Sequence, residues 1–151
     1  MWKRKVVAAL ILAGGMALSQ TAGAQAAPAQ HPLEGTDPTV TGCNVGAYVV
    51  KSWDMRNAVY NEVQGLAQLV YSPKCGMNWV NVYGFTTDNS YRVVMHGHAE
   101  GSNFYETAVG AGGSAATLQT YAPGSTCVDV MWQISNTTSL FREGWGTSTI
   151  C

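Results

Sequence analysis

Residues 65–84, which read GLAQLVYSPKCGMNWVNVYG, constrain the fold of this chain more than any other stretch. Two runs rich in aromatic and β-branched residues, 66–71 and 78–83, flank a connection that reads SPKCG. Pro73 presets its own φ for a turn, and Gly76 can adopt the positive φ that closes a short loop. This pattern predicts a β-hairpin.

Cysteine usage predicts cross-links. The chain has four cysteines, an even number, as is typical of disulfide frameworks in exported proteins. The pairs Cys43–Cys75 and Cys127–Cys151 are favoured because each closes a short loop of neighbouring elements. A zinc site is the competing interpretation, but the sequence has no CxxC pair and the spacings are wide.

The first residues have the features of a secretory signal peptide. Three cations at positions 3–5 precede an apolar run at positions 6–18, which is too short to span a bilayer as a helix. Small residues follow, so a leader over residues 1–24 is expected, with cleavage near Ala24 or Ala26. We therefore expect a secreted, extracellular protein without a transmembrane segment.

Charge narrows the range of partners. The chain has eight Lys and Arg against nine Asp and Glu. Removal of the leader would take away three of the cations and leave a net charge of −4. A mildly acidic domain lacks the basic field that nucleic acid or an anionic membrane surface requires, so neither is an expected partner.

Residues 25–42 differ in composition from the rest of the chain. They hold three of the five prolines and no periodic apolar pattern, which predicts an extended N-terminal arm before a single β domain at residues 43–151. The arm is either a spacer or a segment that engages a partner, as extended peptides do at open sheet edges. In the second case His31, Pro32 and Leu33 are candidate contacts.

The rest of the sequence favours short strands. After the leader, no window of 11 or more residues keeps helical apolar spacing. Strands are expected at 58–64, at 117–121 and at 127–134, while the tail after residue 140 has no clear pattern. About seven to nine short strands in all predict an all-β fold, a small antiparallel sandwich or barrel stabilised by two disulfides.

One local constellation could bind a metal. On an extended backbone His96, His98 and Glu100 point to one face, so two imidazoles and a carboxylate could converge on zinc or copper. The alternative is a polar strand end with solvated side chains. Because that alternative is commoner, no cofactor is expected.

Catalytic motifs are missing from the sequence. Ser72 lies in YSPKC rather than in a G-x-S-x-G elbow, and the GAGGS stretch at 110–114 lacks the Lys of a phosphate-binding loop. The acidic residues are scattered singly. The chain is therefore expected not to be an enzyme.

Exposed aromatic rings are a second resource for binding, because they can stack on sugars or anchor a protein interface. Trp79 and Trp132 are expected to fill the core. Trp53, beside an aspartate, and Trp145, between two glycines, are the better candidates for exposure and for partner contact.

A spaced motif links the chain to a family. The motif comprises Tyr71, Ser72, Pro73, Cys75 and Trp79, with Gly42-Cys43 upstream and Cys127-Val128 downstream. In this combination the chain resembles a family of small secreted actinobacterial proteins known as a domain of unknown function, over about residues 42–130. The resemblance implies a secreted β-rich domain with Cys43 bridged to Cys75, and it supplies no catalytic residues.

In size, leader and arm the chain also resembles the small adaptor subunit of umbrella-shaped antibacterial toxin particles. That adaptor links a large toxin subunit to a lectin subunit through an extended N-terminal segment. The leading hypothesis is thus a secreted, non-enzymatic adaptor with a protein partner. A module that binds carbohydrate or the cell wall is the alternative, and a small metal-dependent enzyme is a third.

Overall fold

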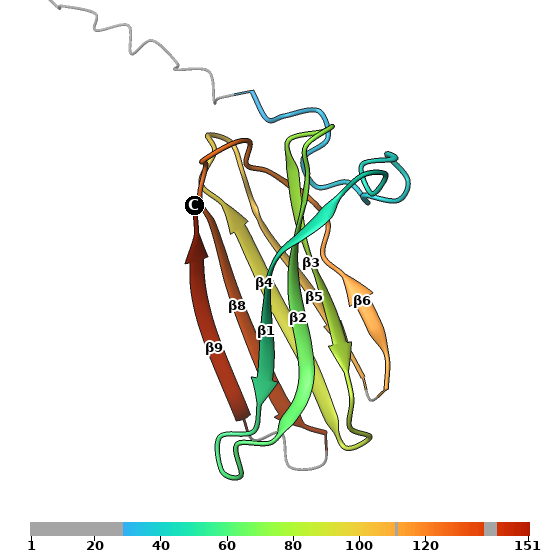
Figure 1. Cartoon of the computed structure of the whole chain (residues 1–151), viewed down its shortest axis with the longest axis vertical. Coiled ribbons are helices and arrows are strands. Elements are labelled where there is room, and N and C mark those ends of the chain that lie inside the picture. Colours follow the sequence, from blue (N-terminus) through green and yellow to red (C-terminus); the bar gives the residue numbers. More distant parts are fainter. Residues whose placement is uncertain (1–28, 111, 138–141) are drawn as a thin grey trace, which may run out of the picture.

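The computed structural model describes residues 29–110, 112–137 and 142–151, and the predicted leader with its cleavage positions lies outside them. The described residues form nine strands in two antiparallel sheets, which lie one over the other as two layers (Figure 1). The all-β prediction is therefore confirmed, and the architecture is that of a sandwich. In the described part of the chain no helix is long and apolar enough to cross a membrane.

One sheet is built around the predicted hairpin. Its order is β1-β2-β3-β6, with β7 paired to another part of β3. These strands are β1 (Tyr48–Arg56), β2 (Val63–Ser72), β3 (Met77–Gly84), β6 (Ser114–Ala116) and β7 (Thr120–Tyr121). The second sheet has the order β5-β4-β8-β9. Its strands are β5 (Phe104–Val109), β4 (Asn89–Gly97), β8 (Val128–Asn136) and β9 (Arg142–Ile150).

The hairpin forms where the turn residues predicted it. β2 and β3 pair without a register shift from Gly65 opposite Gly84 to Ser72 opposite Met77. The carbonyl of Ser72 accepts hydrogen bonds from the backbone N–H groups of Cys75 and Gly76, and Gly76 has a φ of 66°. Glycine adopts that conformation without the steric cost that a side chain would add.

Two strand expectations need correction, and one segment without a clear sequence pattern forms a strand. Residues 58–60 form a turn instead of the start of a strand, because the Asn57 side chain accepts hydrogen bonds from the N–H groups of Val59 and Tyr60. The expected strand at 117–121 is interrupted, since Thr117 turns inward and its hydroxyl accepts from the Val80 N–H. The tail, which has no clear sequence pattern, forms β9.

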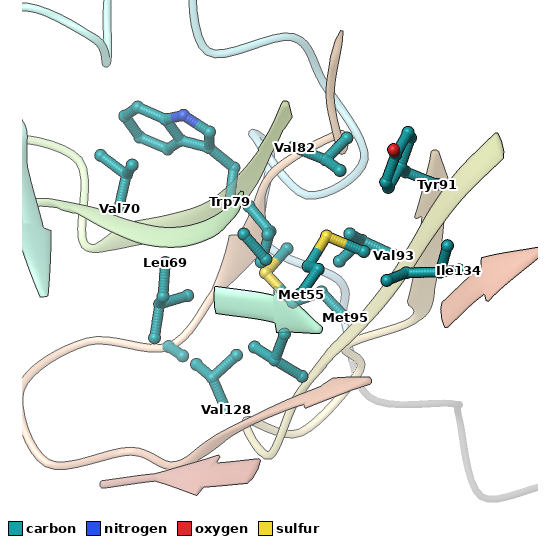
Figure 2. Packing of buried hydrophobic residues seen from close by; sticks show 14 residues of the cluster. Met55, Leu69, Val70, Trp79, Val82, Tyr91, Val93, Met95, Val128 and Ile134 are labelled. Carbon is teal, nitrogen blue, oxygen red and sulfur yellow. The ribbon is translucent and has the colours of Figure 1, made fainter. Parts of the chain in front are cut away.

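Both sheets contribute to one core. Along β4 every second residue is buried, with Tyr91, Val93 and Met95 fully inaccessible to solvent (Figure 2). Trp132 is half-buried and packs against the same cluster, as expected. Trp79 is buried, as expected, but on the outer side of its sheet. Burial of each large apolar side chain stabilises the fold by about 1.5–3 kcal/mol.

Trp79 lies outside the space between the sheets. Figure 2 shows Val70 and Trp79 on one side of their strands and Leu69 on the other, and Val70 pairs with Trp79 in the register of β2 and β3. Each of these two residues nevertheless has at most 5 % of its surface exposed. Its cover must come from outside the sheets, and the N-terminal segment, bonded to this end through Cys75, is placed to supply it.

The described part of the predicted arm is folded rather than extended. Residues 32–46 run through successive turns. Two backbone hydrogen bonds join the segment to the body, from Gly35 to the Gln119 carbonyl and from Gln119 to the Thr36 carbonyl. Glu34 is buried, and its carboxylate accepts hydrogen bonds from the backbone of Asn103 and from Thr120 and Tyr121.

The two favoured disulfides are present. Cys43 pairs with Cys75, and Cys127 pairs with Cys151. The first ties the N-terminal segment to the β2–β3 turn, and the second closes the ends of β8 and β9. Together they hold the two ends of the domain against its sheets.

Candidate functional site

The outer face of the β5-β4-β8-β9 sheet carries three of the side chains singled out in the sequence, His96, His98 and Trp145. Because alternate residues of a strand point to opposite faces, burial of Tyr91, Val93 and Met95 turns Val94 and His96 outward. The neighbouring strands follow the same alternation, and the face is open to solvent.

Strand register assembles one row of side chains across all four strands. His96 lies opposite Phe104 on one side and Asp129 on the other, and Asp129 lies opposite Thr149. Residues directly opposite in antiparallel strands share a face at a Cβ separation of about 5 Å. A row of an aromatic ring, an imidazole, a carboxylate and a hydroxyl results.

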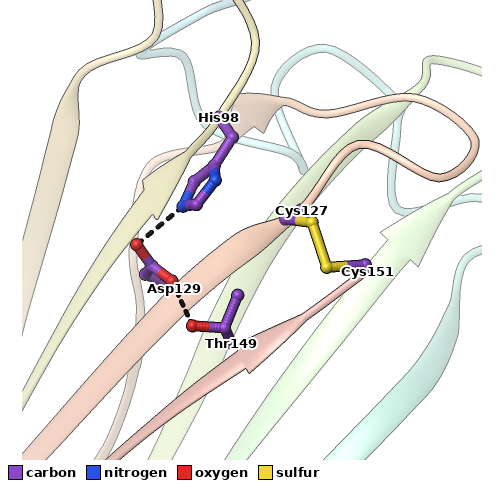
Figure 3. A network of polar contacts seen from close by, with 5 residues as sticks. All are labelled: His98, Cys127, Asp129, Thr149 and Cys151. Atoms are coloured by element: carbon purple, nitrogen blue, oxygen red, sulfur yellow. Dashed lines mark hydrogen bonds and ion pairs between the residues drawn. A yellow bond between two sulfur atoms is a disulfide. The ribbon is translucent and has the colours of Figure 1, made fainter.

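Two hydrogen bonds fix the carboxylate in this row (Figure 3). Nε2 of His98 lies 2.7 Å from Oδ2 of Asp129, and the Thr149 hydroxyl donates to Oδ1 at 2.6 Å. A carboxylate only accepts, so the His98 ring donates from Nε2. The hydrogen bonds from Thr149 and then from His98 hold the pKa of Asp129 below its ordinary value.

A disulfide joins β8 and β9 at the end of the sheet that carries these side chains. Figure 3 shows the Cys127–Cys151 bridge next to the Asp129–Thr149 contact, and each cysteine is two residues from its neighbour in that contact. The backbone N–H of His98 donates to the Cys127 carbonyl, which extends the β4–β8 pairing beyond the last strand residue. The bridge therefore limits fraying of the strands that carry the cluster.

His96 is oriented by its aromatic neighbours. Its ring stacks on Phe104 with centroids 4.1 Å apart and an interplanar angle of 13°, and its centroid lies 5.6 Å from that of His98. One ligand atom each from His96, His98 and Asp129 lies within 4.8 Å of the others. These three side chains form the cluster that we call the His-His-Asp cluster.

Two of the three residues in this cluster, His96 and His98, were predicted from the sequence. The predicted constellation was His96, His98 and Glu100, but Glu100 is not part of the cluster, and Asp129 takes its place. The reason is that β4 ends at Gly97 and Ser102 bonds back to Ala99 in a turn, so period-2 alternation does not extend to position 100. Asp129 comes from the neighbouring strand, and only the register could have indicated it.

A shallow groove of about 470 Å³ runs from this cluster along the sheet. Val94 and Met131 form its apolar floor, and Thr147 adds a hydroxyl on β9. Phe104 and Trp145 stand at opposite corners of the same face, with 72 % and 60 % of their surface exposed. The arrangement offers two aromatic platforms with hydrogen-bonding groups between them.

A second accessible surface is the beginning of β1. The five residues 48–52 are all exposed, whereas an ordinary sandwich strand alternates. Tyr48, Val49 and Val50 have between 41 % and 55 % of their surface exposed. β1 ends its sheet, and among the described residues no strand pairs with its other edge.

The remaining predicted contact residues are not among those that form these surfaces, although Trp53 directly follows residues 48–52 on β1. His31 stacks on Tyr121 of its own domain, with centroids 4.0 Å apart, Pro32 is exposed and Leu33 is half-buried. Trp53 was expected to be exposed but is half-buried and packs against the core. A partner role for these four residues stays a prediction.

The fold and its surfaces thus define a disulfide-linked β-sandwich with an open strand edge at β1 and a grooved sheet face on the other sheet. Comparisons with protein-family models, with curated proteins and with solved structures found no match for this chain.

Proposed function

We propose that this chain is a secreted, non-enzymatic interaction module that binds an extended segment of a partner protein along the free edge of β1. The observation that carries the proposal is the exposure of residues 48–52 on both faces of the strand. An extended peptide added to such an edge gains main-chain hydrogen bonds, and adjacent side chains supply specificity. The two disulfides and the leader expected from the sequence support an extracellular setting.

The edge carries only weak protection against pairing. Natural edge strands are blunted by charges, bulges or covering segments. Here Lys51 is the one charged residue among positions 48–52, and a register shift separates Val49 from Lys51. These features limit pairing between copies of the chain, while Tyr48, Val49 and Val50 remain accessible to a partner.

The test is capture of secreted proteins on the immobilised domain, with variants that alter the edge alone. We expect Val49→Lys and Val50→Lys to abolish capture of the bound protein. Val40→Lys is the matched control, because Val40 is 84 % exposed in the N-terminal turns. Equal capture by all three variants would contradict the proposal.

A more specific version of this proposal is that the chain is the adaptor subunit of an umbrella-toxin particle, and the resemblance in size, leader and arm is its only support. Because residues 31–36 are bonded to the domain itself, we place the partner surface on β1 rather than on the arm. Mass spectrometry of the captured protein tests the finer form, which requires a lectin subunit.

A carbohydrate- or cell-wall-binding role is the second candidate, and the grooved face favours it. Phe104 and Trp145 present exposed rings, and Thr147 and Thr149 offer hydroxyls beside them. Retention on insoluble cell-wall polysaccharide should then be lost in Phe104→Ala and Trp145→Ala. Phe85→Ala, at a ring that is 56 % exposed elsewhere, should be retained like the wild type.

A further inference from the structure

The His-His-Asp cluster combines two imidazoles and one carboxylate at the disulfide-bridged end of the sheet. One ligand atom from each of His96, His98 and Asp129 lies within 4.8 Å of the other two. We propose that these residues bind a divalent late transition-metal ion of the Zn²⁺ type. The proposed site is separate from the edge of β1, so it goes beyond the proposed function.

The distances suit a single ion. Zn²⁺ binds imidazole nitrogen and carboxylate oxygen at about 2.0–2.2 Å, which places neighbouring ligand atoms about 3.3 Å apart in tetrahedral geometry. Nε2 of His98 and Oδ2 of Asp129 are now 2.7 Å apart, and these side chains keep 42 % and 47 % of their surface exposed. Ion binding would replace the His98–Asp129 hydrogen bond, with the ring proton of His98 then on Nδ1. Small rotations of these exposed side chains would bring the three ligand atoms to bonding distance without movement of the strands.

Groups around the ligands are arranged as supports. Thr149 holds Oδ1 of Asp129 and thereby leaves Oδ2 directed at His98. Phe104 stacks on His96 and restricts the orientation of that imidazole. Partners of this kind orient ligands in known metal sites, and their loss lowers metal affinity by about 10- to 100-fold.

The donor set selects the class of ion. Two nitrogens and one oxygen suit Zn²⁺, Cu²⁺ and Ni²⁺, whereas Ca²⁺ requires six to eight oxygen ligands. Three protein ligands also leave a fourth coordination position open. His96 and Asp129 line the groove, so this position is reachable from the face that bears Phe104 and Met131.

Isothermal titration of the untagged, disulfide-bonded protein with Zn²⁺ tests the site. We expect one ion per chain and no heat from Ca²⁺. His98→Ala and Asp129→Asn should each weaken Zn²⁺ binding at least tenfold, and Thr149→Val about tenfold. His31→Ala is the matched control, because His31 is the only other histidine of the chain, stacks on Tyr121 and is not a member of the cluster.

A second measurement locates the ion independently of the variants. In the wild-type protein, Zn²⁺ should shift amide signals of residues 96–98 and 128–130 and leave the His31 ring unchanged. Absence of binding at 1 mM Zn²⁺, or equal weakening in His31→Ala and His98→Ala, would overturn the proposal. The titration uses the protein alone, so its failure leaves the β1 proposal standing.

Discussion

Thr149 donates a hydrogen bond of 2.6 Å to Oδ1 of Asp129 across the β8–β9 pair, two residues from the Cys127–Cys151 bridge. The bridge and the polar contact therefore act on the same strand ends. β9 is the last strand of its sheet and pairs only with β8 there, so the bridge secures an edge strand that carries half of this contact.

Removal of the Cys127–Cys151 bridge by a double Cys→Ser change should lower the free energy of unfolding by about 3–4 kcal/mol. The reason is the entropy regained by the unfolded chain, given a sequence separation of 24 residues. Chemical denaturation measures this loss. Amide exchange at Asp129 and Thr149 should also become faster, because the strand ends can then separate.

The other bridge is the control for this experiment. Cys43–Cys75 closes a separation of 32 residues, so its removal should cost a similar free energy. Amide exchange at the β8–β9 ends should then become faster only to the extent that the whole domain is less stable. If both double variants lost protection from amide exchange at Asp129 to the same extent, beyond the loss in overall stability, the role assigned to Cys127–Cys151 would be contradicted.

Glu34→Ala should destabilise the domain by about 3 kcal/mol. Glu34 is 9 % exposed, and its carboxylate accepts from the backbone N–H groups of Asn103 and Tyr121 and from the Thr120 hydroxyl. The variant would leave the buried Thr120 hydroxyl and the partly buried N–H groups without this partner, at a cost of about 1–3 kcal/mol for each group that water cannot reach.

Thermal and denaturant unfolding measure the effect of Glu34→Ala, and Glu100→Ala is the matched control. Glu100 is exposed, so its removal should change stability by less than about 0.5 kcal/mol. If the two variants had equal stabilities, the N-terminal segment would not be anchored as described. The same contacts mean that deletion of residues 25–42 would test stability together with partner capture.

Local features of this fold could be predicted from the sequence because local physics decides them. The turn around Pro73 and Gly76 and the β-rich runs beside it specify the hairpin without reference to the rest of the chain. The cysteine pairs that the sequence favours each close a short loop of neighbouring elements, and both are present. The turn at residues 58–60 was not predicted, because the hydrogen bonds from the Val59 and Tyr60 N–H groups to the Asn57 side chain leave no signal in the pattern of apolar residues.

The candidate site was only partly predictable, because strand pairing between distant segments decides it. His96 and His98 share a face by alternation alone, but Asp129 joins them through the β4–β8 register. Trp53 and Trp145 show the same limit. Both have small or polar neighbours in sequence, yet Trp53 packs on the core and Trp145 is exposed. Sheet packing, which sequence patterns do not encode locally, separates them.

The Arg92–Glu106 pair should give the domain a small acid-dependent stability term. The hydrogen bond from Arg92, and then its positive charge, lowers the pKa of Glu106 in the folded state, against a raising effect of partial burial. The unfolded state then binds more protons at acidic pH. The contribution is present above the unfolded pKa of about 4.3 and is lost as the pH falls through the lower folded pKa.

Carboxyl NMR titration of the wild type and Arg92→Gln measures this effect. The Glu106 midpoint should rise in Arg92→Gln. The change in stability at pH 7 should stay below about 1 kcal/mol, because both side chains are more than 40 % exposed and solvent screens the pair. An unchanged Glu106 midpoint would show that the pair does not persist in solution.

Gly144→Ala should destabilise the domain by about 2–3 kcal/mol, because β9 approaches β1 of the other sheet at this point. A Cβ atom at position 144 would overlap the carbonyl oxygen of Arg56, a backbone atom that cannot rotate away. The backbone N–H of Ala58 also donates to the Glu143 carbonyl at 2.6 Å, so separation of the strands would break this bond. Overpacking of this kind costs about 1–3 kcal/mol, and the lost hydrogen bond adds to it.

Denaturant unfolding of Gly144→Ala and Gly110→Ala provides the comparison. Gly110 lies in a loop where an added Cβ would meet nothing within 4 Å, so that variant should remain within about 0.5 kcal/mol of the wild type. The same change of side chain is thus made at a crowded and at an open position. Gly144 is on the inner side of β9 and Trp145 is on the outer side. If Gly144→Ala were as stable as the wild type, the two sheets would have to be further apart than described. Trp145 would then be held less firmly on the grooved face.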